Sequence, residues 1–446
     1  MAKNNITQYD ATAANNTDID SINIAEGMAA SDVNNAIRSL MSHLKNMDSG
    51  SQALTSPSFT AMSTDTINEK TSTNGVAIDS VTLKDGELGT TASPVPINSS
   101  SLNGGQFGGR RNLIVNSGMQ VSQRGTSATT MTNAYATVDR FRGFSNGGGA
   151  FTGEQYSMTA SDIASTGQRK ALKVLVSTAD SSIASADYYA IQHKLEGDDL
   201  QHLKYGTSSA ETMTISFFVK SDTTGTYFFT VDKIANGQTA YRLPQEFTIS
   251  SADTWEKKTL TISPTAGSTS LITSSAGVIG GGTGHGMSLY WGFAWGTDYH
   301  GTNNTWGTGT FATNASANGF MSTIGNEFFL TGVQLELGSV ATPFEHRSFG
   351  EELTLCQRYF YRFGMNNFNN ASPATSAFLS QHIQYPVTMR STPTLSRSSN
   401  GTFSSNLAFS AFSGATDDMC QILFQASSAS TNCFVVGLVG DCDAEL

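Results

Sequence analysis

The chain has 446 residues, a formal net charge of -11 and a sequence pI near 5.1, and only 14% of its residues are charged. The acidic balance argues against a nucleic-acid partner, because such proteins gather Lys and Arg on one face. The low charged fraction, with 43 Gly and 26 Phe, indicates a β-rich protein and not a helical enzyme, whose amphipathic helices need charged outer faces.

The first fifty residues contain one predicted helix, residues 31–47. Its apolar positions follow a 4-3-4-3 spacing, as in the seam of a coiled coil: Val33, Ile37, Leu40, Leu44 and Met47. Two heptads fall short of the three or four that establish a coiled coil, so a single amphipathic helix packed on a neighbour is equally compatible. No apolar run approaches the roughly 18 residues of a membrane span, and the first residues lack a signal peptide's apolar stretch. We therefore expect cytoplasmic synthesis and no membrane insertion.

Residues 51–109 are rich in Ser, Thr, Asn and Gly and too poor in apolar residues to fill a core alone. Val76 and Ile78, then Val81 and Leu83, alternate as very short strands between turn signals. Strands this short are marginal in one chain. The segment is either a flexible linker or a shaft in which three chains wrap together, and the alternation favours the trimeric shaft.

Residues 110–350 are predicted to form a jelly-roll-like β-sandwich, because short strand patterns recur between clusters of turn residues. The expected strands are residues 113–115, 172–176, 188–195, 214–220, 227–231, 255–262, 289–295 and 328–337. The two-residue period places Trp291, Phe293 and Trp295 on one face, which we expect to be core.

Residues 351–446 are predicted to contain a short helix at 351–362 and then a small C-terminal β domain. The four cysteines all lie here, at Cys356, Cys420, Cys433 and Cys442. They have neither C-x-x-C spacing nor a histidine at metal-ligand spacing, so we expect free thiols and no metal site.

Catalytic motifs are weak. Residues 143–147 match G-x-S-x-G, but a strand-like run follows where a nucleophile elbow needs a helix. Paired carboxylates occur at residues 198–199, 351–352 and 417–418. Adjacency does not place two acids across a cleft, so turn or helix-start roles are more ordinary. We predict no enzyme activity and no cofactor.

Four stretches of the chain contain recognisable motifs. They are NTDI, IAEG and VNNAIR within 16–38; RNLIVNSGM, QRG and DRF within 111–141; QLELG, ATPFEHR, EEL and CQRY within 334–359; and YPVTMR with TPT within 385–394. Together these stretches resemble the tail-fibre proteins of bacteriophages. The second is similar to the opening of a carbohydrate-binding-like sandwich, and the third is the most specific. The fourth departs from the family by carrying Thr388 in place of a proline.

The resemblance implies a virion tail fibre that works as a homotrimer and mediates adsorption to a bacterial host. It implies attachment to phage tail or adaptor proteins through residues 1–50. The receptor would be a host surface glycan or a protein. The alternatives are a fibre-borne polysaccharide depolymerase, which commonly has a repeating β-helix not visible here, and a head or collar decoration fibre.

A glycan-contacting patch is predicted in the Gly- and Asn-rich loop 296–309. Its members are Tyr299, His300, Asn303, Asn304 and Trp306. Aromatic rings stack on the C–H faces of sugars, and nearby amides bind the hydroxyls. The alternative is that Trp306 packs inward as core.

Overall fold

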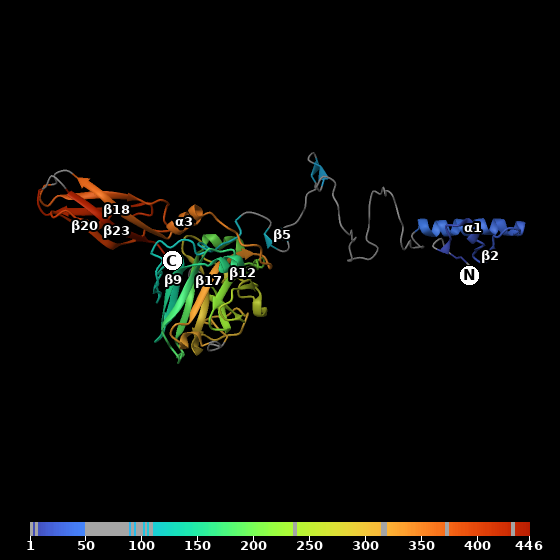
Figure 1. Cartoon of the computed structure of the whole chain (residues 1–446), viewed down its shortest axis with the longest axis horizontal. Helices are drawn as coiled ribbons and strands as arrows, with labels where there is room; N and C mark the ends of the chain where they lie inside the picture. The colour runs from blue at the N-terminus through green and yellow to red at the C-terminus, as the bar shows by residue number, and fades with distance from the viewer. Residues whose placement is uncertain are drawn as a thin grey trace. The chain divides into compact units, whose positions relative to one another are not determined.

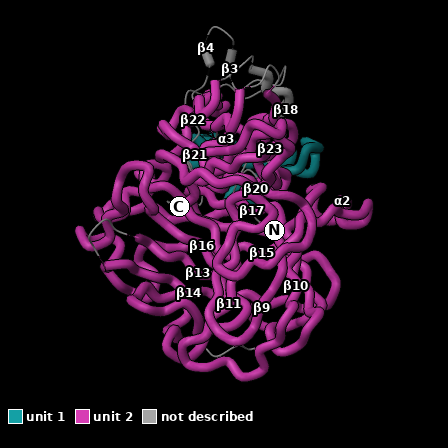
Figure 2. Tube along the Cα trace, turned by 90° about the vertical axis from the view of Figure 1, so that its left-hand side faces the viewer, with its two compact units in different colours: residues 1–96 teal, residues 97–446 magenta. Residues whose placement is uncertain are grey.

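The computed structural model describes residues 3–4, 8–49, 110–234, 239–313, 319–370, 374–429 and 433–446, together with four two-residue strands between 89 and 106. The chain divides into two units, Met1–Pro96 and Ile97–Leu446, coloured separately in Figure 2. Most of the predicted shaft, including its alternating pairs at 76–78 and 81–83, lies outside the described residues. The trimeric shaft therefore stays a prediction.

The N-terminal unit contains helix α1 (Ala30–Asp48), drawn blue in Figure 1, and this confirms the helix predicted at 31–47. A 3-10 turn (Ala13–Asn15) and the hairpin β1 (Asp18–Ile19) and β2 (Ile22–Asn23) precede it. His43 is buried, hydrogen-bonded to the Tyr9 hydroxyl and paired with Asp20 at 3.0 Å. Five apolar side chains of the same helix are exposed: Val33, Ile37, Leu40, Met41 and Leu44. Four of the five residues of the heptad stripe, all except Met47, are thus exposed in the single chain.

Four very short strands follow in two antiparallel pairs. The pairs are β3 (Gly89–Thr90) with β4 (Ser93–Pro94) and β5 (Ser101–Leu102) with β6 (Gly105–Gln106). Two-residue pairs contribute little stability by themselves in water.

Two antiparallel sheets form the predicted β-sandwich, and the chain is mainly β. The six-stranded sheet has the order β15-β12-β17-β10-β9-β7 and the five-stranded sheet β14-β13-β16-β11-β8. The strands are β7 (Thr129–Thr130), β8 (Phe141–Asn146), β9 (Ala150–Ser157), β10 (Lys170–Thr178), β11 (Tyr188–Glu196), β12 (Met213–Ser221), β13 (Gly225–Lys233), β14 (Tyr241–Ile249), β15 (Glu256–Ile262), β16 (His285–Trp295) and β17 (Glu327–Leu337). Figure 1 shows β9, β17 and β12 running across one layer. Seven of the eight predicted strands overlap these elements. The G-x-S-x-G run lies in β8 and the turn before β9, without a following helix.

The prediction that Trp291, Phe293 and Trp295 share one face is wrong in part. Trp291 and Phe293 lie in the main core between the sheets, whereas Trp295 packs in a separate cluster with Phe311. The pairing of β16 with β11 shifts register between Tyr189 and Ala190. A bulge adds one residue, and one residue is enough to send every later side chain to the opposite face.

The prediction of a strand at 113–115 is also wrong. This segment runs alongside β17 but does not form a strand in its sheet. The amide of Leu113 donates to the Leu335 carbonyl at 2.9 Å, but Asn112 occupies the neighbouring position with its side chain. Its Nδ2 donates to the Val333 carbonyl at 3.0 Å and its Oδ1 accepts from the Leu335 amide at 3.2 Å. The side-chain amide thus replaces the backbone of an edge strand.

The C-terminal region contains the predicted short helix and β domain. Helix α3 (Phe349–Gln357) ends before residue 362, because strand β18 begins at Phe360. One three-stranded sheet is β18 (Phe360–Asn370), β23 (Cys433–Asp443) and β20 (Thr394–Phe403); the other is β19 (Phe378–Gln384), β22 (Met419–Ala426) and β21 (Leu407–Ser413). All four cysteines are buried free thiols. Among the described helices, none combines the length and apolar character of a membrane span.

Buried charges join this C-terminal domain to the sandwich. Arg140, 1% exposed, pairs with Glu445, and its Nη2 donates to the Lys194 carbonyl at 2.6 Å. Arg124 reaches Glu445 at 3.4 Å. The two domains of the second unit are therefore connected by ion pairs whose side chains are at most 9% exposed.

A half-buried histidine, His285, makes stability depend on pH. Burial, with the neighbouring charge of Lys194, lowers the pKa of His285 to about 4. The unfolded chain has a histidine pKa near 6.5, so the unfolded state takes up the proton first as the pH falls. This group therefore removes stability progressively from about pH 6.5 down to pH 4, by about 1–3 kcal/mol in total.

The variant His285→Gln, which keeps a partner for the Ser288 hydroxyl now bonded to His285 Nε2 at 2.7 Å, isolates this effect. We expect the difference in unfolding free energy between wild type and variant to change by that amount between pH 7 and pH 4.5 in urea titrations. Parallel pH profiles for the two proteins would contradict the assignment.

Candidate functional site

The structure divides the five residues of the predicted glycan patch. Tyr299 is half-buried, with its ring edge-on to Tyr188 at 5.6 Å between centroids. His300 is half-buried and its Nε2 lies 3.0 Å from the Trp295 carbonyl. Asn303 and Asn304 are exposed, and Asn304 Oδ1 accepts from Gln245 Nε2 at 2.9 Å. A glycan contact at these four residues stays a prediction.

Trp306 does not belong to that patch. It is 2% exposed, its Nε1 donates to the Ser263 carbonyl at 2.8 Å, and its ring meets Tyr205 edge-on. A ring buried in this way offers no face to a sugar. The inward alternative left open by the sequence is the one that the structure adopts.

The loop turns inward because the outer face of the five-stranded sheet is aromatic. Phe311 stacks on Trp295 with ring centroids 4.6 Å apart. The Phe311 amide donates to the Tyr299 carbonyl at 2.7 Å, and the Gly301 amide donates to the Ala312 carbonyl at 2.8 Å. The loop thus covers apolar rings that would otherwise face water.

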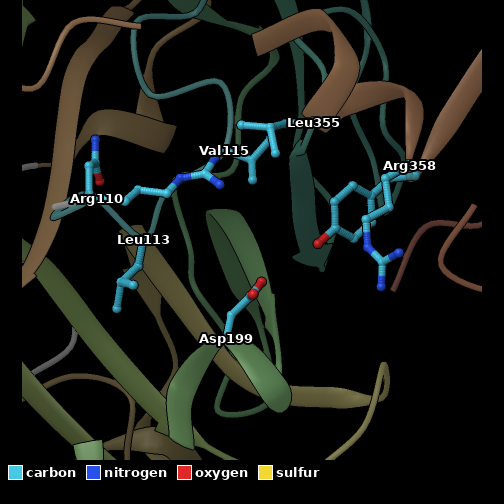
Figure 3. Close-up of a pocket in the computed structure, with 8 residues that line it drawn as sticks. Arg110, Leu113, Val115, Asp199, Leu355 and Arg358 are labelled. Carbon is cyan, nitrogen blue, oxygen red and sulfur yellow. The ribbon is translucent and has the colours of Figure 1, made fainter. Parts of the chain in front are cut away.

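A different pocket combines polar groups with an apolar wall. It has a volume of about 140 Å³ and is lined by Arg110, Asn112, Leu113, Val115, Asp199, Leu355, Arg358 and Tyr359. In Figure 3 the Asp199 carboxylate points into the space between the side chains of Arg110 and Arg358. Binding pockets usually have this character, with apolar walls and a few convergent polar groups.

Asp199 is held by a short 3-10 helix (Asp198–Leu203) that follows β11. Leu200 and Leu203 anchor this turn in the core, and Asp198 accepts a hydrogen bond from the Gly282 amide. Gly197 must be glycine, because a Cβ there would lie 1.8 Å from the Gly280 carbonyl oxygen. The paired carboxylates 198–199 therefore start a helical turn, as the sequence indicated, and Asp199 is the one left facing the pocket.

The opposite walls come from two distant segments. Asn112 fixes the 110–115 segment on β17, and its backbone amide donates to Glu345 Oε2 at 2.9 Å. Helix α3 contributes Leu355, and the residues after it contribute Arg358. Ser348 caps that helix by accepting from the Glu351 amide at 3.2 Å.

Charge is distributed unevenly around the pocket. Arg358 is held by Glu196 through two hydrogen bonds of 2.9 and 2.8 Å, which raise the pKa of its guanidinium. No hydrogen bond or ion pair within the described part of the chain involves the side chain of Arg110 or Asp199. Burial, and then the charge of Glu196, raise the pKa of Asp199, while Arg358 and Arg110 oppose the shift.

This arrangement suits a polyhydroxylated ligand. Asp199 can accept hydrogen bonds from hydroxyls, Arg110 can donate to ring or hydroxyl oxygens, and Leu113, Val115 and Leu355 can cover C–H faces. Among the described residues, no group of three or more His, Cys, Asp or Glu side chains could hold a metal ion.

We predicted a binding site in the loop 296–309 and not at this pocket, although two motifs noted in the sequence contribute to the pocket. Two of the fibre-like motifs supply its walls, RNLIVN with Leu113 and Val115 and CQRY with Arg358 and Tyr359. We predicted no binding residue in either motif. Arg110, Leu355 and Asp199 lie outside the fibre-like motifs, and Asp199 had no signal beyond its place in a carboxylate pair.

Comparisons with known proteins concern the fold alone. No family model matches the sequence, and the curated proteins give no match. Three of the similar solved structures are a family 11 carbohydrate-binding module of Clostridium thermocellum (12% identity, 50% of this chain, 99% of that chain, TM-score 0.25), a putative sugar-binding protein of Bacteroides thetaiotaomicron (12%, 51%, 100%, 0.25) and the enzymatically active domain of bacteriophage CBA120 tailspike protein 4 (10%, 51%, 21%, 0.27). These identities and TM-scores are too low to transfer a ligand or an activity.

Proposed function

We propose that this chain is a bacteriophage tail-fibre subunit that binds a glycan on the surface of its bacterial host. The observation that carries the glycan part is the pocket, where the side chains of Arg110 and Asp199 lie beside an apolar wall and make no hydrogen bond or ion pair within the described residues. The phage part is supported by the four fibre-like sequence stretches. The uncovered heptad stripe of α1 supports a fibre built from several chains.

Binding fits the pocket better than glycan hydrolysis. Most glycosidases use two carboxyl groups on opposite sides of the scissile bond. Asp199 is the sole carboxylate among the residues that line this described pocket. Glu196 nearby is 3% exposed and engaged by Arg358. A fibre-borne depolymerase is therefore the weaker candidate.

The pocket is tested by Asp199→Ala, with Asp417→Ala as a matched control. Both aspartates are exposed and each belongs to an adjacent carboxylate pair. Loss of hydrogen bonds from a charged acceptor costs about 1.5–3 kcal/mol, so we expect cell binding to weaken by about 10- to 100-fold in the first variant. The control should bind like wild type. Fluorescently labelled fibre titrated onto host cells measures both.

Two results would contradict the proposal. Equal affinity of Asp199→Ala and wild type would remove the pocket from receptor binding. Unchanged binding after periodate oxidation of the cell-surface glycans would exclude a periodate-sensitive glycan receptor and favour a protein.

A further inference from the structure

A second hollow lies between the sandwich and the C-terminal domain, and it shares no lining residue with the pocket of Arg110 and Asp199. Its volume is about 320 Å³. The sandwich contributes Thr130 and Tyr135, and the C-terminal domain contributes Ser396 and Asp443. We call it the junction groove. It exists only because the C-terminal domain docks on the sandwich, since neither domain alone supplies both sides.

The charges at the base of the junction groove are already matched. Arg362 binds Asp441 through two hydrogen bonds of 2.6 and 2.8 Å. Arg124 lies 3.3 Å from Asp443, and its guanidinium stacks on the Phe360 ring at 3.5 Å from the centroid. An anionic or cationic ligand would have to compete with a partly buried ion pair, which is unfavourable. The groove therefore selects against charged ligands.

Its polar atoms nevertheless retain capacity for further hydrogen bonds. A carboxylate offers about four acceptor positions, and Asp443 keeps 45% of its side chain exposed. Thr129, Thr130 and Ser396 are exposed and present hydroxyls at the rim. These fixed donors and acceptors match a ligand that carries many hydroxyl groups.

An aromatic surface completes this chemistry. Tyr135 lines the groove and is half-buried, and the Arg124 guanidinium lies 5.3 Å from its ring centroid. The Arg142 guanidinium also lies 5.8 Å from that centroid. These cations hold the ring in place, and the part of it that lines the groove can contact the C–H groups of a sugar. Preorganised groups of this kind lose little entropy when a ligand binds.

We propose that the junction groove is a binding site for neutral oligosaccharides, separate from the pocket of Arg110 and Asp199. The inference does not depend on adsorption to a host, because it follows from the groove's own residues. The two sites differ in their charges, since the side chains of Arg110 and Asp199 in the first pocket make no hydrogen bond or ion pair within the described residues, whereas Arg362 and Asp441 in the groove are paired.

The test uses the whole chain on an array of immobilised neutral and uronic-acid-containing oligosaccharides. Thr130→Trp and Ser396→Trp each fill the groove from an exposed position, one from either domain. Thr259→Trp, on an exposed position of β15, is the matched control. We expect wild type and control to retain neutral oligosaccharides and both filling variants to lose at least 10-fold in affinity. Asp443→Asn, which keeps an acceptor for the Glu445 amide, should also weaken binding and serves if a tryptophan variant misfolds.

Asp199→Ala separates the two sites, since it should retain these neutral ligands while losing cell binding. The proposal is overturned if no neutral oligosaccharide binds, if neither filling variant weakens binding, or if Thr259→Trp weakens it as much. If the chain does not bind cells but still retains neutral oligosaccharides on the array, the proposed role of the first pocket is contradicted and the proposal for the junction groove is not.

Discussion

Replacing Glu445 by alanine is expected to destabilise the second unit by about 3–5 kcal/mol, the cost of leaving a buried charge without its partner. Arg140 is 1% exposed and bound to Glu445, and its guanidinium lies 3.5 Å from the centroid of the Tyr359 ring. Without the carboxylate, Arg140 keeps the Lys194 carbonyl and the ring but loses its compensating charge. Urea unfolding of wild type and variant measures the loss.

The matched control is Glu211→Ala. Glu211 also pairs with a cation, Lys204 at 2.7 Å, but their side chains are 43% and 54% exposed. Exposed pairs contribute at most about 1 kcal/mol, so the control should change stability little. The double variant Glu445→Ala, Arg140→Met should recover part of the loss, because it removes the stranded charge. Equal losses for Glu445→Ala and Glu211→Ala would mean that the buried pair does not hold the domains.

The second large effect is expected for self-association through α1. Ile37 and Leu44 are 52% and 47% exposed and stand seven residues apart on the apolar stripe. Burying such a side chain is worth about 1.5–3 kcal/mol, repeated in every chain of an assembly. The double variant Ile37→Asn, Leu44→Asn should therefore lose the association made by the helix.

Light scattering after size-exclusion chromatography tests this on the full chain. We expect wild type at three times the chain mass of 47.3 kDa and the double variant at a lower mass at low micromolar concentration. The control, Arg38→Asn with Lys45→Asn, has the same spacing one position along the helix and should keep the wild-type mass. A wild-type monomer, or a double variant with unchanged mass, would contradict the stripe as an assembly surface.

Sequence alone determined the features that depend on local pattern. The 4-3-4-3 spacing from Val33 to Met47 located α1, because a helix repeats its faces within a few residues. Alternating apolar residues bounded by turn signals located seven strands of the sandwich for a similar reason, and they indicated a β domain at residues 351–446 without locating most of its strands. Low charge and abundant small polar residues were sufficient to indicate a mainly β protein.

Tertiary structure decided what depends on residues far apart in the chain. A single bulge opposite Ala190 places Trp295 on the other face of its sheet. The loop 296–313 packs over the aromatic side chains on that face, where Phe311 stacks on Trp295. Asp199 meets Arg110 and Arg358 only because the core fixes three separate segments. Local propensity contains no information about contacts between residues far apart in the chain, since the free energy that selects these contacts comes from burial and charge pairing across the folded unit.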